Sequence, residues 1–127
     1  MDPERLKAIP VFASLDEETL RGIATFATET SVPAGKHLLN EGDYAYEFMA
    51  IEEGQAEVVR GGERVATLGP GDFFGEIAVL ERTLRTASVV AITPMRLMTL
   101  SHWDLKRVGG AMEQIRETLE ERKRSNA

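Results

Sequence analysis

Glycine-containing turn sequences recur at short intervals between Thr30 and Leu68, and this spacing limits the fold more than any other feature of the chain. The turns lie at residues 33–35, 41–43, 53–54 and 61–62. Between them the apolar pattern has a period of two, which predicts short strands at residues 36–39, 47–51, 56–59 and 64–68. The Gly61-Gly62 pair favours a tight hairpin. Several short strands at this spacing predict a β-sandwich or a β-roll.

Helical patterns precede this region. Residues 1–28 are predicted to be helical, and Pro10 separates a short helix near Glu4–Ile9 from a longer one, with Phe12 packed between them. The order Ser14-Leu15-Asp16-Glu17 is that of a capping box, which predicts that the longer helix begins there. Its apolar residues then follow at helical spacing, at Leu20, Ile23, Ala24 and Ala27.

Two more strands and two more helices are predicted after the turn region. The strands are expected at residues 85–92 and 95–100, on either side of Thr93-Pro94. Ser101 is the expected N-cap of a helix over about 102–108, and a second helix over about 111–123 follows. Gly109-Gly110 lies between them and favours a break or hinge, because glycine costs about 1 kcal/mol in a helix interior. The order of helices, strands and helices predicts an α+β fold.

The composition is that of an ordinary globular domain. The chain has 127 residues, of which 43% are hydrophobic and 28% charged, so one domain over 1–127 is expected. Its net charge of −6 argues against nucleic acid as a partner. No apolar run is long enough to cross a membrane, and the N-terminus lacks the apolar core of a signal peptide. A cytoplasmic location without membrane contact is therefore expected.

The stretch from Gly71 to Val89 carries the residues that favour a ligand site. The apolar run after Glu76 is long enough for only one helical turn, and the start of a helix offers free N–H groups to a phosphate. Arg85 adds a planar fork of donors that suits phosphate oxygens, and the small residues after it let a ligand approach the backbone. Glu76 would repel a phosphate but can accept a hydrogen bond from a sugar hydroxyl. The alternative is structural: a turn glycine at Gly75, an acid at a helix start, and a surface arginine that pairs with it.

This stretch resembles the phosphate-binding cassette of cyclic nucleotide-binding domains. The resemblance lies in Phe74-Gly75-Glu76-Ile77-Ala78 and Arg85-Thr86-Ala87-Ser88-Val89, at the spacing of that family. Weaker similarities in the turn sequences extend it over about residues 8 to 120. The resemblance implies an antiparallel, jelly-roll-like β-roll of about eight strands. It divides the chain into N-terminal helices (1–28), a roll (29–100) that contains the cassette (74–89), and C-terminal lid helices (101–127).

The resemblance also implies the roles of particular residues. Arg85 would pair with the cyclic phosphate of cAMP or cGMP, and Glu76 would accept a hydrogen bond from the ribose 2′-hydroxyl. The other cassette residues expected at the ligand are Gly75, Ile77, Ala78, Thr86 and Ala87. The base would lie near Val58, Ala66 and Leu68. Met112, Ile115 and Leu119 are candidates for the lid contact, and the alternative is that this stripe only packs on the roll or on another copy of the chain.

The cassette departs from the common pattern of the family at three positions. Leu84 stands where many members have proline, and Arg82 lies close enough to Arg85 to compete with it or partly replace it. Thr86 stands where many cAMP-selective members have alanine, and its hydroxyl could bond to the guanine edge of cGMP. The choice between cAMP and cGMP therefore stays open.

Catalytic and metal sites are disfavoured by residue counts. His37 and His102 are the only histidines and there is no cysteine, whereas a zinc site uses three or four protein ligands. Neither histidine has an evident nucleophile partner, so we expect a sensor and not an enzyme, with no cofactor besides the nucleotide. Its output would be a protein partner or a fused effector domain, and the oligomeric state stays open. The alternative function is a β-roll scaffold that binds proteins without a nucleotide.

Overall fold

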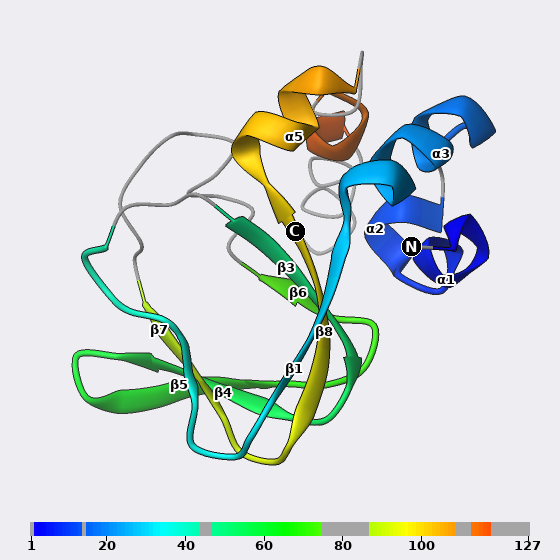
Figure 1. Cartoon of the computed structure of the whole chain (residues 1–127). Coiled ribbons are helices and arrows are strands. Elements are labelled where there is room, and N and C mark those ends of the chain that lie inside the picture. Colours follow the sequence, from blue (N-terminus) through cyan, green and yellow to red (C-terminus); the bar gives the residue numbers. More distant parts are fainter. Residues whose placement is uncertain (1, 14, 44–46, 75–86, 109–112, 118–127) are drawn as a thin grey trace.

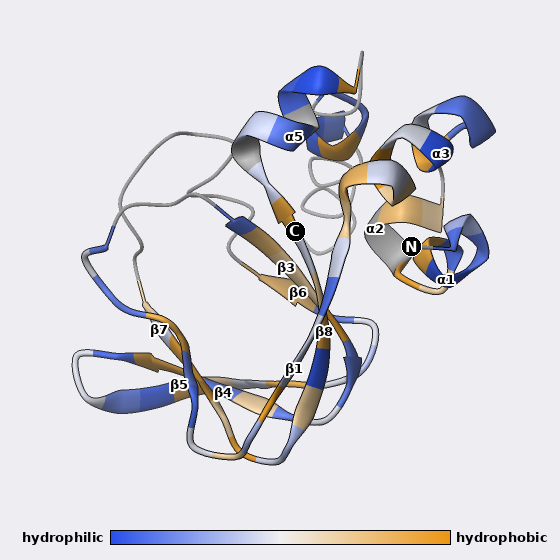
Figure 2. Ribbon diagram, viewed as in Figure 1, coloured by the Kyte–Doolittle hydropathy of each residue, from blue (hydrophilic) through white to orange (hydrophobic). Residues whose placement is uncertain are grey.

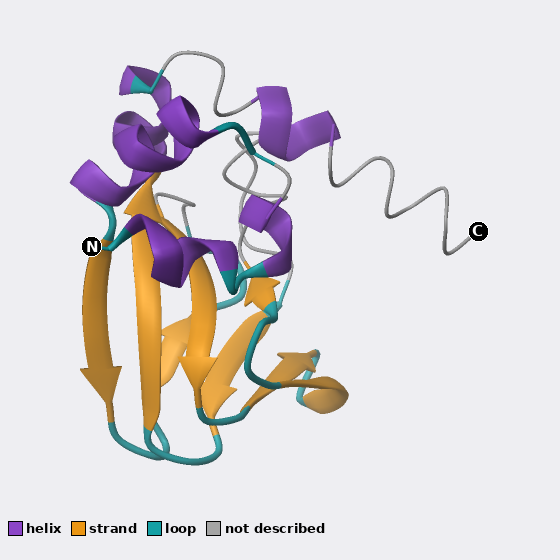
Figure 3. Ribbon diagram, turned by 90° about the vertical axis from the view of Figure 1, so that its right-hand side faces the viewer, coloured by secondary structure: helices purple, strands orange, loops and turns teal. Residues whose placement is uncertain are grey.

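The computed structural model describes residues 2–13, 15–43, 47–74, 87–108 and 113–117 of the chain. Three short helices come first: α1 (Pro3–Lys7), α2 (Pro10–Ala13) and α3 (Glu17–Phe26). α5 (His102–Arg107) follows the strands, and residues 113–117 are also helical. The helices gather at one end of the strands, as Figures 1 and 3 show.

Eight strands are formed within the described residues, as the resemblance implies, and they make two antiparallel four-stranded sheets. One sheet has the order β1-β8-β3-β6, and we call it the helix-backed sheet. The other has the order β2-β7-β4-β5, and we call it the open sheet. The strands are β1 (Thr28–Val32), β2 (His37–Leu39), β3 (Glu47–Glu53), β4 (Ala56–Arg60), β5 (Glu63–Leu68), β6 (Phe73–Phe74), β7 (Ser88–Ala91) and β8 (Met95–Ser101).

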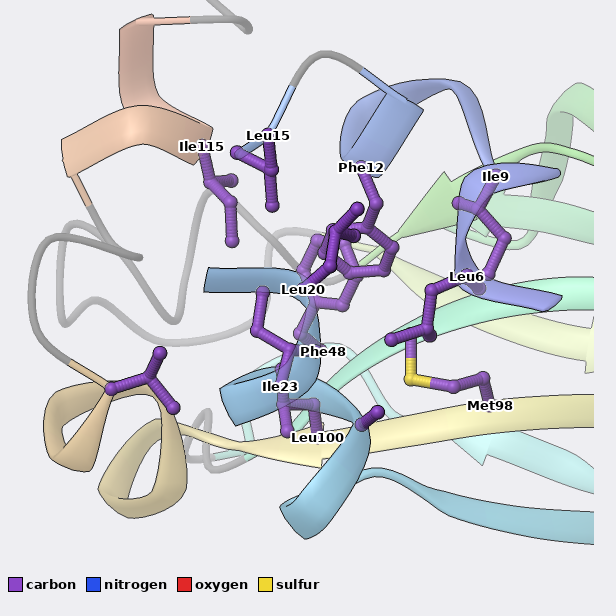
Figure 4. Packing of buried hydrophobic residues seen from close by; sticks show 13 residues of the cluster. Leu6, Ile9, Phe12, Leu15, Leu20, Ile23, Phe48, Met98, Leu100 and Ile115 are labelled. Carbon is purple, nitrogen blue, oxygen red and sulfur yellow. The ribbon is translucent and has the colours of Figure 1, made fainter. Parts of the chain in front are cut away.

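The side chains of the helix-backed sheet alternate between two hydrophobic clusters. Phe48 and Ala50 of β3 face the helices, whereas Met49 and Ile51 face the interior of the roll, and all four are buried. This alternation is the period of two of a β-strand with both faces covered. The helix-side cluster contains Leu6, Ile9, Phe12, Leu15, Leu20, Ile23, Ala24, Phe48, Ala50, Met98, Leu100, Val108 and Ile115 (Figure 4). The roll cluster contains Leu39, Met49, Ile51, Ala56, Phe74, Val89, Ala91, Met95 and Leu97.

The N-terminal prediction is confirmed only in part, because a third helix, α2, forms between the two expected ones. Phe12 is fully buried and packs against Phe48, with 5.6 Å between the ring centroids. The capping box at Ser14 is wrong, because α3 begins at Glu17 and its N-cap is Asp16. The Asp16 carboxylate accepts a hydrogen bond from the Thr19 amide at 2.8 Å. Asp16 therefore caps the helix, two residues after the predicted cap at Ser14.

Other predicted elements are close to their observed bounds. The β4–β5 hairpin turns at Gly61 and Gly62, whose φ angles of 60° and 82° are positive as such a turn requires. Ser101 accepts a hydrogen bond from the Asp104 amide at 3.1 Å, which confirms it as the cap of α5. The predicted strand 85–92 is shorter in the structure, where β7 covers Ser88–Ala91. β1 lies at an edge of the helix-backed sheet, before the first strand that the sequence pattern predicted.

Candidate ligand-binding site

The two ends of the cassette are attached to different sheets. Phe74 ends β6 in the helix-backed sheet, where its neighbour Met49 is its pairing partner, and Ala87 directly precedes β7 in the open sheet. The residues that connect them therefore join one sheet to the other. Among these, the predicted site residues Gly75, Glu76, Ile77, Ala78, Arg85 and Thr86 lie outside the described residues, as do the lid candidates Met112 and Leu119 and the hinge Gly109-Gly110.

The residues predicted to surround the base lie on neighbouring strands of the open sheet. Val58 of β4 pairs with Ala66 of β5 on one side and with Val89 of β7 on the other. Leu68 pairs with Ala56, two residues along the same face. Ala56 and Val89 are buried in the roll cluster, so this face points to the interior of the roll. The structure thus brings all three predicted base residues onto one wall.

This wall is apolar but incompletely covered in the described part of the chain. Val58 and Leu68 are half-buried and pack against the roll cluster, whereas Ala66 is exposed. The pairing register shifts between Val58 and Val59, which leaves Val65 as the extra residue of a bulge, with 53% of its surface exposed. An apolar surface that the described residues leave partly exposed suits the flat face of a nucleobase.

The start of β7 is braced by a loop that the sequence pattern marked only as a turn. The Ser88 hydroxyl accepts a hydrogen bond from the Glu41 amide at 2.9 Å. The Glu41 carboxylate accepts a longer hydrogen bond, of 3.4 Å, from the amide of Gly61 in the β4–β5 hairpin. Sequence analysis included Ser88 in the cassette but missed its bond to Glu41, because a bond between positions far apart in the chain leaves no periodic signal.

Ile115, a lid candidate, is placed in the helix-side cluster. It is fully buried, and Figure 4 shows it beside Leu15 and Leu20. The side-chain amide of the neighbouring Gln114 donates hydrogen bonds of 3.2 Å to the Asp16 carboxylate and to the Thr19 hydroxyl at the start of α3. The structure therefore packs this part of the C-terminal segment against the N-terminal helices, on the other side of the helix-backed sheet from the predicted base wall.

The described groups with clearly shifted pKa values lie in or beside the N-terminal helices and in the helix-backed sheet, and none is a predicted site residue. The hydrogen bond from Arg5 lowers the pKa of Glu29, and bonds to Glu29 and Glu52 raise that of Arg5. The hydrogen bond from the Thr19 amide lowers the pKa of Asp16. A cavity of about 400 Å³ lies between α1, β3 and the turn before β6. Its lining residues are Arg5, Ala8, Ile9, Ile51, Glu52, Pro70, Gly71 and Arg96.

The described residues contain no metal-ligand group and no membrane-spanning helix. No group of three or more histidine, aspartate or glutamate side chains among them is arranged to hold a metal. The His37 ring lies 3.2 Å from the Asn40 amide oxygen and is exposed. No helix within these ranges is both long and apolar enough to cross a bilayer.

Comparison with known proteins gives the family. The model of the cyclic nucleotide-binding domain family matches residues 29–109, well over half of the chain. The chain is also 36% identical over 113 residues to the cAMP-dependent protein kinase regulatory subunit of Schizosaccharomyces pombe. This match covers 87% of the chain and 27% of that subunit. A roll of two four-stranded sheets with a helical cap is the architecture that the resemblance implied. The chain belongs to the cyclic nucleotide-binding domain family.

Other relatives share the fold but differ in what their names say of the ligand. The cGMP-dependent protein kinase egl-4 of Caenorhabditis briggsae is 29% identical over 126 residues, which cover 94% of this chain and 17% of that kinase. The solved regulatory subunit of a cAMP-independent protein kinase A from Trypanosoma brucei superposes with a TM-score of 0.85 at 22% identity. The match covers 95% of this chain and 44% of the trypanosomal chain. The chain thus spans less than a third of the two curated relatives and under half of the trypanosomal subunit.

Proposed function

We propose that this chain is a sensor that binds cAMP or cGMP through its cassette, and that its C-terminal helices relay the occupancy of the site. The observation that carries the proposal is the sequence Gly75-Glu76 with Arg85 at the family's spacing, in a chain that belongs to that family. The described wall of Val58, Ala66 and Leu68 adds an apolar surface beside the end of the cassette.

The proposed contacts divide the affinity between two parts of the site. A micromolar ligand requires roughly −8 kcal/mol, and a hydrogen bond to a charged group contributes about 1.5–3 kcal/mol. The Arg85 pair with the phosphate and the Glu76 bond to the ribose would supply about half of the total. Stacking and burial of the base against the wall must supply the rest, since apolar burial contributes about 25 cal/mol per Å².

The identity of the nucleotide is part of the proposal and rests on one residue. Thr86 offers a hydroxyl that can bond to a guanine edge, which favours acceptance of cGMP beside cAMP. The names of the relatives include a cAMP-dependent, a cGMP-dependent and a cAMP-independent protein, so family membership alone does not decide the ligand.

The relation to kinase regulatory subunits supports a regulatory domain, and we propose that it has no catalysis of its own. Its output would be a catalytic partner chain or a fused effector domain. We propose that the whole chain is one domain that acts in the cytoplasm. A protein-binding β-roll without a nucleotide is the second candidate. The trypanosomal relative, the regulatory subunit of a kinase named as cAMP-independent, is the observation that favours it.

Calorimetric titration of the purified chain with cAMP, and separately with cGMP, tests the proposal. We expect saturable binding of at least one nucleotide. Arg85→Ala should abolish it while the melting temperature without ligand stays nearly unchanged, because Arg85 serves the ligand. Arg82→Ala is the matched control, since it removes the same charge three residues away in the sequence.

Three other outcomes would count against the proposal. No heat from either nucleotide at millimolar concentration would favour the scaffold function. Loss of binding in Arg82→Ala and not in Arg85→Ala would show that Arg82, and not Arg85, binds the phosphate. Marked unfolding of Arg85→Ala without ligand would make Arg85 a structural residue.

A further inference from the structure

Ser88 is the first residue of β7, and the two strands beside β7 hold it unequally. On one side of β7, the pairing with β4 ends where Ser88 lies opposite Val59. On the other side, the pairing with β2 ends one step earlier, at Leu39 and Val89. Ser88 is therefore held by the sheet on one side only, and its other side needs a different partner.

The Ser88 side chain supplies that partner. Its hydroxyl accepts a hydrogen bond of 2.9 Å from the amide of Glu41, which lies two residues beyond the end of β2. The turn that carries Glu41 is closed by a bond of 3.2 Å from the Asp43 amide to the Asn40 carbonyl. This side-chain bond extends the contact between β2 and β7 beyond their backbone pairing, up to the residue that follows Ala87.

A second contact joins the β4–β5 hairpin to the same loop. The Glu41 carboxylate accepts from the Gly61 amide at 3.4 Å, where the hairpin turns. The hairpin and the start of β7 both lie on the left in Figure 1. The backbone of Glu41 thus holds Ser88 while its side chain reaches the strand pair that carries Val58 and Ala66.

Ser88 does not face the proposed ligand. Successive side chains of a strand point to opposite faces, and Val89 and Ala91 of β7 are buried in the roll cluster. Ser88 therefore lies on the outer face of the open sheet, opposite the wall of predicted base residues. Any effect of its hydroxyl on binding has to act through the position of the backbone.

We propose that Ser88 is a positioning residue for the ligand site, with the Glu41 amide as its partner; this inference rests on the proposed function. The bond fixes the first residue of β7, and Arg85, Thr86 and Ala87 are the three residues directly before it. A binding group held in place before the ligand arrives loses less freedom on binding, so affinity rises without a new contact. Glu41 is exposed and Ser88 is half-buried, so water can reach the bond and replace it in a variant while the fold persists.

Thr93 provides a matched control at the other end of the same strand. Its hydroxyl accepts a hydrogen bond of 3.0 Å from the Gln55 amide, which is the same kind of bond at nearly the same length, and it also donates one of 3.0 Å to the Pro94 carbonyl. It lies two residues after β7, away from the cassette. Ser88→Ala and Thr93→Val each remove one hydroxyl, and Ser88→Thr keeps the hydroxyl of Ser88.

The experiment measures the dissociation constants of cAMP and cGMP for the wild-type chain and these three variants, together with their melting temperatures without ligand. We expect Ser88→Ala to bind about three- to tenfold more weakly, because the residues before β7 would lose part of their pre-organisation. Thr93→Val should bind within about twofold of wild type, although it should lose at least as much thermal stability as Ser88→Ala, because its hydroxyl makes two hydrogen bonds. Ser88→Thr should restore the wild-type affinity.

Two results would overturn the inference and leave the proposed function intact. One is wild-type affinity in Ser88→Ala. The other is an equal loss of affinity in Ser88→Ala and Thr93→Val, which would mean that any loosening of β7 weakens binding. Absence of binding by the folded wild-type chain is a different result, because it overturns the proposed function and the positioning role together.

Discussion

The two sheets of the roll differ in how completely their faces are covered. In the helix-backed sheet, residues 48–51 of β3 are buried one after another, because helices pack on one face and the open sheet lies toward the other (Figures 1 and 3). In the open sheet, five of the six residues of β5 are exposed and the sixth, Leu68, is only half-buried. Figure 2 shows apolar residues along β3 and β8 and more polar ones along β5. The first sheet is a scaffold, and the second has an apolar wall that the described residues do not fully cover.

An ion-pair network adds to the rigidity of the scaffold. Arg5 of α1 bonds to Glu52 of β3 at 2.7 Å and pairs with Glu29 of β1 at 3.1 Å. Arg96 of β8 pairs with Glu29 at 3.2 Å and with Glu53 at 2.9 Å. The Arg5 contacts join the first helix to β1 and β3, and the Arg96 contacts join β8 to the same two strands. Because most of these groups are partly exposed, we attribute orientation of α1 to them more than stability.

Truncation of Ile115 should have the largest effect, and it tests whether the scaffold includes the C-terminal segment. Ile115→Ala should lower the free energy of unfolding of the ligand-free chain by about 2–5 kcal/mol, because it leaves a cavity in a fully buried site. Chemical denaturation measures this change. If stability is unchanged and only nucleotide affinity falls, Ile115 acts as a lid and the assignment to the scaffold is wrong.

Truncation of Leu68 in the open sheet should show the opposite pattern. Leu68 is half-buried, so Leu68→Ala should cost only about 1 kcal/mol of stability. Nucleotide affinity should fall, because Leu68 belongs to the proposed base wall. Paired denaturation and calorimetry of this variant and Ile115→Ala check the contrast, and a stability loss as large as that of Ile115→Ala would remove the distinction between the two sheets.

The smallest effect is expected from the ion-pair network, through its dependence on pH. The hydrogen bond from Arg5 lowers the pKa of Glu29 in the folded chain, so its contribution is present above the unfolded pKa of about 4.3 and is lost as the pH falls below it. Glu29→Gln should flatten the decline of stability between about pH 5 and pH 3. Melting curves across this range measure the slope, and an unchanged slope would show that Glu29 does not contribute to it.

The sequence predicted the elements whose signals are local. The β4–β5 hairpin follows from Gly61-Gly62, and the cap of α5 from Ser101, because each depends on neighbouring residues. β1 was missed because its sequence, Thr-Glu-Thr-Ser-Val, is polar and lies at an exposed edge, where no apolar alternation is required. The start of α3 was misplaced because Ser14 and Asp16 are both good N-caps, and the observed helix uses Asp16.

The candidate site was predictable only in part. The pattern of the cassette predicted a nucleotide-binding family, and comparison with known proteins confirms the family. Val58, Ala66 and Leu68 lie on one wall in the structure, and their contact with a base stays a prediction. The bulge at Val65 depends on strand register, which the sequence pattern does not show. The bond between Ser88 and Glu41 joins residues that are 47 positions apart, so only the folded chain reveals it.

Amide hydrogen exchange with and without saturating cAMP or cGMP tests the central claim most directly. The account predicts that the nucleotide slows exchange in the open sheet, over residues 56–68 and 88–91, and in the cassette. Exchange in β3 and β8 should change little, because these strands are already buried on both faces. Slowing confined to β3, β8 and the helices, or no slowing at all, would contradict the assignment of the open sheet as the ligand wall.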